Sequence, residues 1–124
     1  MTRSEYDFYT HLQELFGDRF LIFPQVHISA IIDHKVKGQS WRKAFFNING
    51  KSVDYVFCDK EHVEPILAIE LDDPSHKWRR RVRRDQEVEQ MFREANLPLF
   101  RFRDYENFSS EDIFNKITPS LKRI

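Results

Sequence analysis

The chain has 124 residues, of which 40% are hydrophobic and 15% aromatic. That is enough for one hydrophobic core and too little for two, so we expect a single domain that spans residues 1–124. The 20 basic residues balance the 20 acidic ones, so net charge alone gives no argument for nucleic acid or a membrane as partner. Cys58 is the single cysteine, which excludes an internal disulfide and a zinc site built from thiolates alone.

The first ten residues, MTRSEYDFYT, lack the apolar core of a signal peptide. No apolar run approaches the ~20 residues that a membrane span needs. We therefore expect a cytoplasmic protein with no membrane partner.

The N-terminal half is predicted to hold one helix and one strand. Apolar residues recur at helical spacing from Tyr6 to Phe16, with Ser4 as the expected N-cap and Gly17 closing the helix. The strand RFLIFPQVHI follows, and Pro24 favours an edge position or a strand end for it. The next stretch is predicted to hold a short helical turn at AIIDHK (30–35), a loop at VKGQS (36–40) and one or two helical turns at WRKAFFNI (41–48).

The C-terminal half is predicted to begin with a hairpin, because only DKEHVE separates the strands KSVDYVFC (51–58) and PILAIELD (65–72). A helix is expected from Lys77 to Ala95 and a fourth strand at 97–103. A final helix should start at 110, capped by Ser109 or Ser110 and cut short by Pro119. This order predicts an α/β layer around a small mixed central sheet.

Acidic residues interrupt the two hairpin strands, which are otherwise apolar on both faces, as covered central strands are. Glu70 and Asp72 are two residues apart and should point the same way. A turn centred near His62 places Asp54 opposite Glu70, so three carboxylates converge. Such a cluster costs several kcal/mol unless a proton or a cation neutralises it. Mg²⁺, which takes oxygen ligands, is the simplest candidate.

The alternative interpretation of these acids is structural. Asp54 and Glu70 would then pair with arginines, and Asp72 and Asp73 would form a turn or cap the next helix. Asp73 in particular precedes Pro74 directly, which favours an exposed turn or cap residue.

The run KWRRRVRR has six cations in eight residues, and helical spacing places Lys77, Arg80, Arg81 and Arg84 on one face. Such a face can neutralise phosphates beside the carboxylates without reading a base sequence. The alternative is a solvated helix surface. Cations in the first turns oppose the helix dipole, however, and this cost favours a function.

Two further charged residues interrupt apolar patterns. Asp85 lies between Val82 and Val88 and should face inward, where it would hold an arginine or His76 in place or form a simple salt bridge. Arg101 alternates with phenylalanines on the fourth strand, so it would point to the site or only pair with an acid.

The segments VDYVFCD, EPILAIELDDPSH and RRDQEVEQMFREANLPLFRFR together resemble the PD-(D/E)xK nuclease superfamily. The resemblance is closest to the very-short-patch repair endonucleases and to small uncharacterised bacterial domains of that type. It covers residues 51–103 and extends to the first helix. It implies a restriction-endonuclease-like αβββαβ core with helices on either side of a small mixed sheet.

The resemblance also implies roles for single residues. Asp54 and Glu70 match the metal-binding acids, and Asp72 stands where better-known members have a lysine that orients the attacking water. The repair-endonuclease branch tolerates this change and uses a nearby histidine, which makes His76 the candidate general acid or base. His76 as a locally hydrogen-bonded residue at a helix start is the alternative. Glu5 matches a helical acid often found at such sites.

The preferred interpretation is an endonuclease that needs Mg²⁺ or Mn²⁺ and hydrolyses DNA by metal-activated water. One rival is a nuclease-like module that has lost catalysis with its lysine and holds nucleic acid through the basic helix. Another is a non-enzymatic interaction domain whose acids form ion pairs. No separate recognition domain is evident, so specificity is left to a protein partner or to a homodimer.

Overall fold

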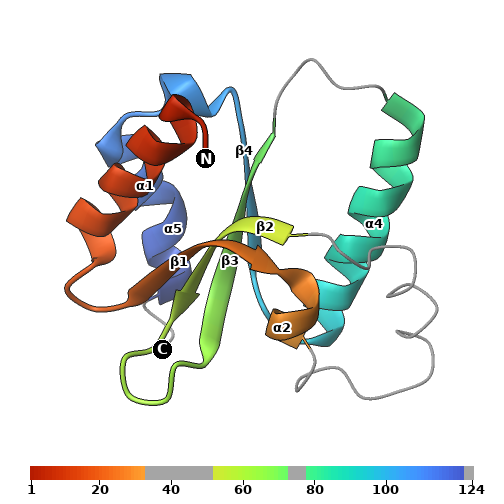
Figure 1. Ribbon diagram of the computed structural model, residues 1–124, viewed down its shortest axis with the longest axis horizontal. Helices are drawn as coiled ribbons and strands as arrows, with labels where there is room; N and C mark the ends of the chain where they lie inside the picture. The colour runs from red at the N-terminus through yellow and green to blue at the C-terminus, as the bar shows by residue number, and fades with distance from the viewer. Residues whose placement is uncertain (33–51, 73–77, 122–124) are drawn as a thin grey trace.

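A computed structural model describes residues 1–32, 52–72 and 78–121, with the side chains of residues 78–85 outside the description. The described residues form a mixed α/β fold in which helices flank a four-stranded sheet (Figure 1). Its elements are α1 (Arg3–Phe16), β1 (Leu21–His27), α2 (Ile28–Ile32), β2 (Ser52–Cys58), β3 (Pro65–Asp72), α4 (Trp78–Glu94), β4 (Leu99–Arg103), the 3-10 helix η1 (Tyr105–Asn107) and α5 (Ser110–Leu121).

The sheet has the strand order β1-β2-β3-β4, and only the pair β3 and β4 is parallel. The hairpin of β2 and β3 is closed by Asp59, whose carboxylate accepts hydrogen bonds from the backbone N–H groups of His62 (2.9 Å) and Glu64 (3.1 Å). β3 and β4 can run parallel because α4 carries the chain back along the sheet. The predicted hairpin and the mixed sheet are confirmed.

Among the described strands, β1 lies at the edge of the sheet, which is one of the two positions that Pro24 favoured. Pro24 pairs with Tyr55 and Val26 pairs with Val53. The residue between them, Gln25, has a φ of 51° and leaves the regular ladder. The β1–β2 ladder is therefore interrupted beside Asp54, which lies between Val53 and Tyr55.

Apolar residues form a core on each face of the sheet. Tyr55 and Leu67 belong to the core beneath α1 and α5. Val56 and Ala68 belong to the opposite core, together with Phe92 of α4. Figure 1 accordingly shows α1 and α5 on one side of the sheet and α4 on the other. The two central strands are covered on both faces, as their continuous apolar pattern predicted.

The helix caps differ in part from expectation. Thr2, and not Ser4, is the N-cap of α1: its hydroxyl accepts from the Glu5 backbone N–H, and the Glu5 carboxylate accepts from the Thr2 N–H. At α5 the predicted cap Ser109 is confirmed, because it exchanges two hydrogen bonds of 3.1 Å with Asp112.

The prediction that Pro119 cuts the final helix short is wrong, since α5 continues to Leu121. A proline inside a helix loses one backbone hydrogen bond and clashes with the preceding turn. Ile117 and Leu121 are buried in the α1–α5 core, and their burial offsets that cost. The short helix α2 starts two residues before the predicted turn, and the pieces expected at 36–50 lie outside the described residues.

Candidate functional site

Asp54 lies where β2 and β3 part. The last pair of that ladder is Tyr55 and Ile69, so the next pair in the same register is Asp54 and Glu70, as the hairpin predicted. In place of a continued backbone ladder, Oδ2 of Asp54 accepts a hydrogen bond from the Leu71 backbone N–H at 2.7 Å. The Asp54 side chain thus satisfies a strand N–H group that would otherwise lose its partner.

Glu70 and Asp72 lie on the α4 side of β3. Ala68 belongs to the core on that side, whereas Leu67 and Ile69 belong to the opposite core. Side chains alternate along a strand, so Glu70 and Asp72 continue the row of Ala68. Their side chains are only 22% and 23% exposed. Two carboxylates on one strand are therefore held side by side in a partly buried position.

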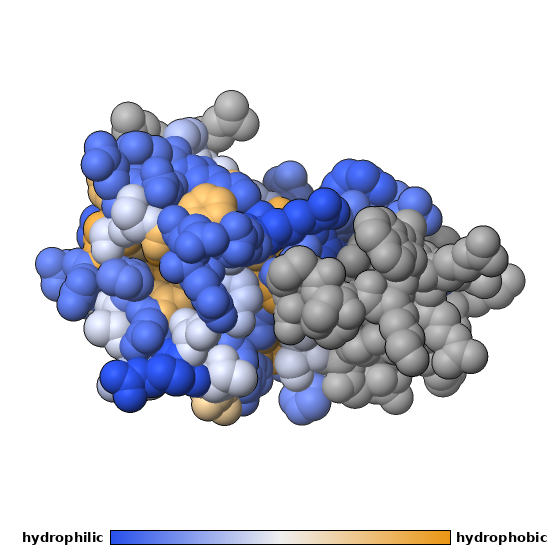
Figure 2. Space-filling model, turned by 90° about the horizontal axis from the view of Figure 1, so that it is seen from above, coloured by the Kyte–Doolittle hydropathy of each residue, from blue (hydrophilic) through white to orange (hydrophobic). Residues whose placement is uncertain are grey.

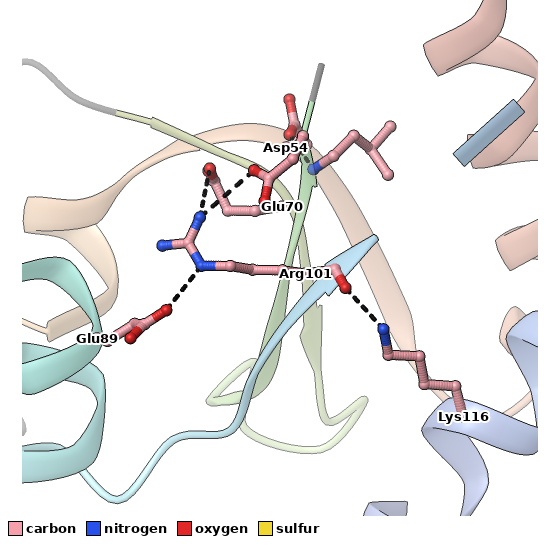
Figure 3. Close-up of polar contacts among 7 residues, drawn as sticks. Asp54, Glu70, Glu89, Arg101 and Lys116 are labelled. Atoms are coloured by element: carbon pink, nitrogen blue, oxygen red, sulfur yellow. Dashed lines mark hydrogen bonds and ion pairs between the residues drawn. The ribbon is translucent and has the colours of Figure 1, made fainter. Parts of the chain in front are cut away.

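Arg101 lies among these acids. It pairs with Glu70 in the parallel register of β3 and β4, and its side chain is 17% exposed. Nη1 lies 3.9 Å from Oε2 of Glu70 and 3.4 Å from Oδ1 of Asp72. Figure 3 shows the guanidinium group reaching from β4 toward the carboxylate of Glu70. Arg101 is therefore a counter-ion of both Glu70 and Asp72.

A third carboxylate approaches the same guanidinium from α4. Oε1 of Glu89 accepts a hydrogen bond from Nε of Arg101 at 2.9 Å, and the Glu89 side chain is 43% exposed. The hydrogen bonds of Arg101 thus link β4 to both β3 and α4 (Figure 3). Its planar guanidinium suits this task, because the donors on Nε and Nη1 point in different fixed directions.

The backbone of Arg101 is held from the other side of the sheet. Nζ of Lys116 in α5 donates to the Arg101 carbonyl oxygen at 2.6 Å and lies 4.3 Å from the centre of the Phe102 ring. Figure 3 shows Lys116 on the far side of β4 from the guanidinium group. This contact fixes the strand from which Arg101 projects.

Tyr55, which follows Asp54 on β2, contacts α1 on the other face of the sheet. Its hydroxyl donates to the backbone carbonyl of Glu5. Burial, followed by the negative charges of Asp54 and Glu5, raises the pKa of the Tyr55 phenol above its usual value. The Glu5 carboxylate itself caps α1, so Glu5 serves the helix start on the face opposite Arg101.

The structure brings together Glu70, Asp72 and Arg101, and it places Asp54 beside them through Leu71. Of the other predicted site residues, His76 and Lys77 lie outside the described residues. The four charged residues predicted in the first half of α4 lie on that helix, but their side chains are not described; they are Arg80, Arg81, Arg84 and Asp85.

Sequence reasoning missed Glu89 and Lys116. Glu89 follows Val88 on the edge of the apolar stripe of α4, and an acid at that position is the one signal that could have pointed to it. Lys116 precedes the buried Ile117 on α5, and nothing in its surroundings along the chain distinguishes it from an exposed lysine.

The donor set suits a hard divalent cation, because carboxylate oxygens are the ligands that Mg²⁺ prefers. As they stand, however, no three His, Cys, Asp or Glu side chains within residues 1–32, 52–72 and 86–121 are grouped to hold a metal ion. The guanidinium of Arg101 already occupies the position of a cation beside Glu70 and Asp72.

The end of the molecule at which β3 leads toward α4 is seen from above in Figure 2. The described surface on this view is mostly hydrophilic, with smaller apolar areas between the charged groups. Within the described ranges, no helix combines the length and the apolar character needed to cross a membrane.

The chain belongs to a protein family of unknown function, DUF2726, whose model matches residues 1–120. Comparison with curated proteins found no match, and neither did comparison with solved structures.

Proposed function

We propose that this protein is a metal-dependent nuclease of the PD-(D/E)xK type that hydrolyses phosphodiester bonds of DNA. The element order α1-β1-α2-β2-β3-α4-β4 supports this proposal, because apart from the short helix α2 it matches the αβββαβ order that the sequence resemblance implies. The observation that carries it is the register of β2 and β3, which makes Asp54 and Glu70 the next opposed pair. Asp72 follows on the same side of β3.

In this proposal, Asp54, Glu70 and Asp72 would hold the divalent cation, which when bound supplies an activated water and stabilises developing negative charge. Lys116 fixes β4 and thereby the starting point of the Arg101 side chain. Arg101 lies beside both Glu70 and Asp72 and offsets one of their two negative charges, which lowers the cost of holding them side by side. His76 is the candidate for moving protons, and the basic residues of α4 are the candidates for holding the phosphate backbone.

Cleavage of supercoiled plasmid and of linear DNA tests this proposal. The chain, Asp54→Asn and Glu70→Gln are compared with Mg²⁺ or Mn²⁺ and with a chelator. The parent protein should nick DNA only with the cation, and both variants should lose nicking because each lacks a charge that the cation needs. Glu61→Gln is the matched control, because it makes the same chemical change in the exposed hairpin turn. Nicking that persists in Glu70→Gln would refute the site.

A second candidate function is a nucleic-acid-binding module without catalysis. Arg101 favours it, because a permanent guanidinium beside Glu70 and Asp72 offsets part of the negative charge that would attract a metal. DNA binding that is unchanged by a chelator, together with no cleavage under any metal condition, would select this module over the nuclease.

A further inference from the structure

We propose that a pocket between α1 and the segment that follows β4 binds a guanidinium group on a short alkyl chain, such as an arginine side chain. In Figure 1 the start of α1 lies beside that segment. The pocket is on the α1–α5 side of the sheet, whereas Glu70 and Asp72 lie on the α4 side. The inference therefore goes beyond the proposed nuclease site and needs neither a metal ion nor DNA.

The size of the pocket matches such a group. Its volume is about 240 Å³, and a molecule of liquid water takes ~30 Å³, so the pocket has room for roughly eight non-hydrogen atoms. An arginine side chain beyond Cα fills most of this space. Within the described ranges, no three acids or histidines are close enough together to hold one metal ion. The acids of the pocket therefore suit a larger cation that has several donors.

Two carboxylates reach the pocket from different elements. Asp7 belongs to α1 and its side chain is 58% exposed, and Glu106 belongs to η1. Nε of the exposed Arg3 lies 3.5 Å from Oδ1 of Asp7, so this acid already has a guanidinium group beside it. Because a carboxylate has about four lone-pair sites, both acids can accept further hydrogen bonds from a ligand.

Side-chain contacts hold the walls of the pocket in place. Oγ of Ser4 donates to Oε1 of Glu106 at 2.9 Å and joins α1 to η1. Nδ1 of His11 lies 2.7 Å from Oγ of Ser110 and joins α1 to the first residue of α5. The acids are therefore positioned before a ligand enters, which lowers the entropic cost of binding.

Aromatic rings complete the lining, namely those of Phe8, Tyr105 and Phe108. Phe8 and Tyr105 meet edge to face, with ring centres 6.3 Å apart. The same aromatic cluster already holds one cation, because Nζ of Lys116 lies 4.3 Å from the centre of the Phe102 ring and 5.8 Å from that of Phe108. Ring faces attract cations, and a guanidinium group also stacks on them. Carboxylates and rings together therefore favour a flat cation.

A guanidinium group fits this lining better than an ammonium group. It is planar and carries five N–H donors in fixed directions, whereas an ammonium group is a compact point charge. The acceptors of the pocket come from α1 and η1, so a ligand must donate in more than one direction while it lies against a ring.

An NMR titration of the isotope-labelled protein with Nα-acetyl-arginine amide tests the inference. Saturable shift changes should centre on Asp7 and Glu106. The corresponding amide of citrulline has the same shape without the charge, so it should bind at least about tenfold more weakly. The lysine amide should bind several-fold more weakly, because it lacks the planar group.

Variants of the two acids test the site itself. Glu106→Gln keeps an oxygen acceptor for Ser4 but removes a charge, and it should weaken binding of the arginine amide about tenfold. Its matched control is Glu111→Gln at an exposed position of α5, which should leave the affinity within about twofold. Asp7→Asn should also weaken binding, with the exposed Asp18→Asn as its control.

Three results would overturn the inference: no saturable shift change, equal affinity for the arginine and citrulline amides, or an affinity that neither Glu106→Gln nor Asp7→Asn alters. Lysine amide bound as tightly as arginine amide would overturn the preference for guanidinium. Free arginine distinguishes the sources of the ligand. Capped amide that binds at least as tightly as free arginine indicates an arginine of a polypeptide, whereas tighter binding of free arginine indicates a small guanidino compound.

Discussion

Arg101→Met should destabilise the metal-free protein, because it leaves three acids without their shared counter-ion. The guanidinium group lies 2.9 Å from Glu89, 3.4 Å from Asp72 and 3.9 Å from Glu70. Fully exposed ion pairs contribute about 0–1 kcal/mol, whereas breaking a buried one costs about 3–5 kcal/mol. With Arg101 at 17% exposure, we expect an intermediate loss of about 1–3 kcal/mol in the free energy of unfolding.

Urea unfolding followed by far-UV circular dichroism measures this loss. A double-mutant cycle with Glu89→Gln then isolates the shortest of the three ion pairs, and a coupling free energy of about 1 kcal/mol is expected. Arg93→Met is the control, because it makes the same substitution at an exposed arginine. It should change the free energy of unfolding by less than about 0.5 kcal/mol. A cycle that is additive within ~0.3 kcal/mol, or an Arg101→Met variant as stable as the control, would refute the role of Arg101 as counter-ion.

Three further predictions concern other parts of the chain. Asp54→Ala should cost about 1–2 kcal/mol of unfolding free energy in the same assay, because the Leu71 N–H loses its acceptor. Asp54→Asn retains an oxygen acceptor and should cost less. Equal losses of unfolding free energy in the two variants would contradict this prediction. Burial, reinforced by the charge of Asp59, raises the pKa of the Cys58 thiol from its ordinary 9.0 to about 11. The stabilisation of the fold by the protonated thiol is complete below pH 9 and is lost as the pH rises through about 11. In Cys58→Ala the free energy of unfolding should therefore decline less over this pH range than in the parent protein. A parallel decline in the two proteins would contradict this prediction. Replacing Arg80, Arg81 and Arg84 of α4 should weaken DNA binding and reduce the dependence of its affinity on salt. Titration with labelled DNA at several salt concentrations measures both effects. An unchanged salt dependence would mean that these residues form only a solvated surface.

Much of the sheet was predictable because its evidence is local. The six-residue connection forces β2 and β3 into a hairpin, and the alternation of side chains then places Glu70 and Asp72 on the same side of the sheet. Pro24 indicated the edge strand for a similarly local reason. The prediction of Ser4 as the cap of α1 was wrong, although Thr2 and Glu5 have the spacing of a capping box.

The contacts of Arg101 were less predictable, because they depend on how α4 is rotated over the sheet. The stripe of α4 shows that Val88 and Phe92 face the core, but it does not tell which strand lies beneath Glu89. The Asp54 contact was missed for a different reason. A pattern of apolar residues gives the register of two strands, whereas it does not show where their backbone ladder ends.

Anomalous diffraction from a crystal soaked in Mn²⁺ tests the central claim most directly. The account predicts a peak bounded by the carboxylates of Asp54, Glu70 and Asp72. A well-diffracting crystal at saturating Mn²⁺ that shows no peak there would contradict it.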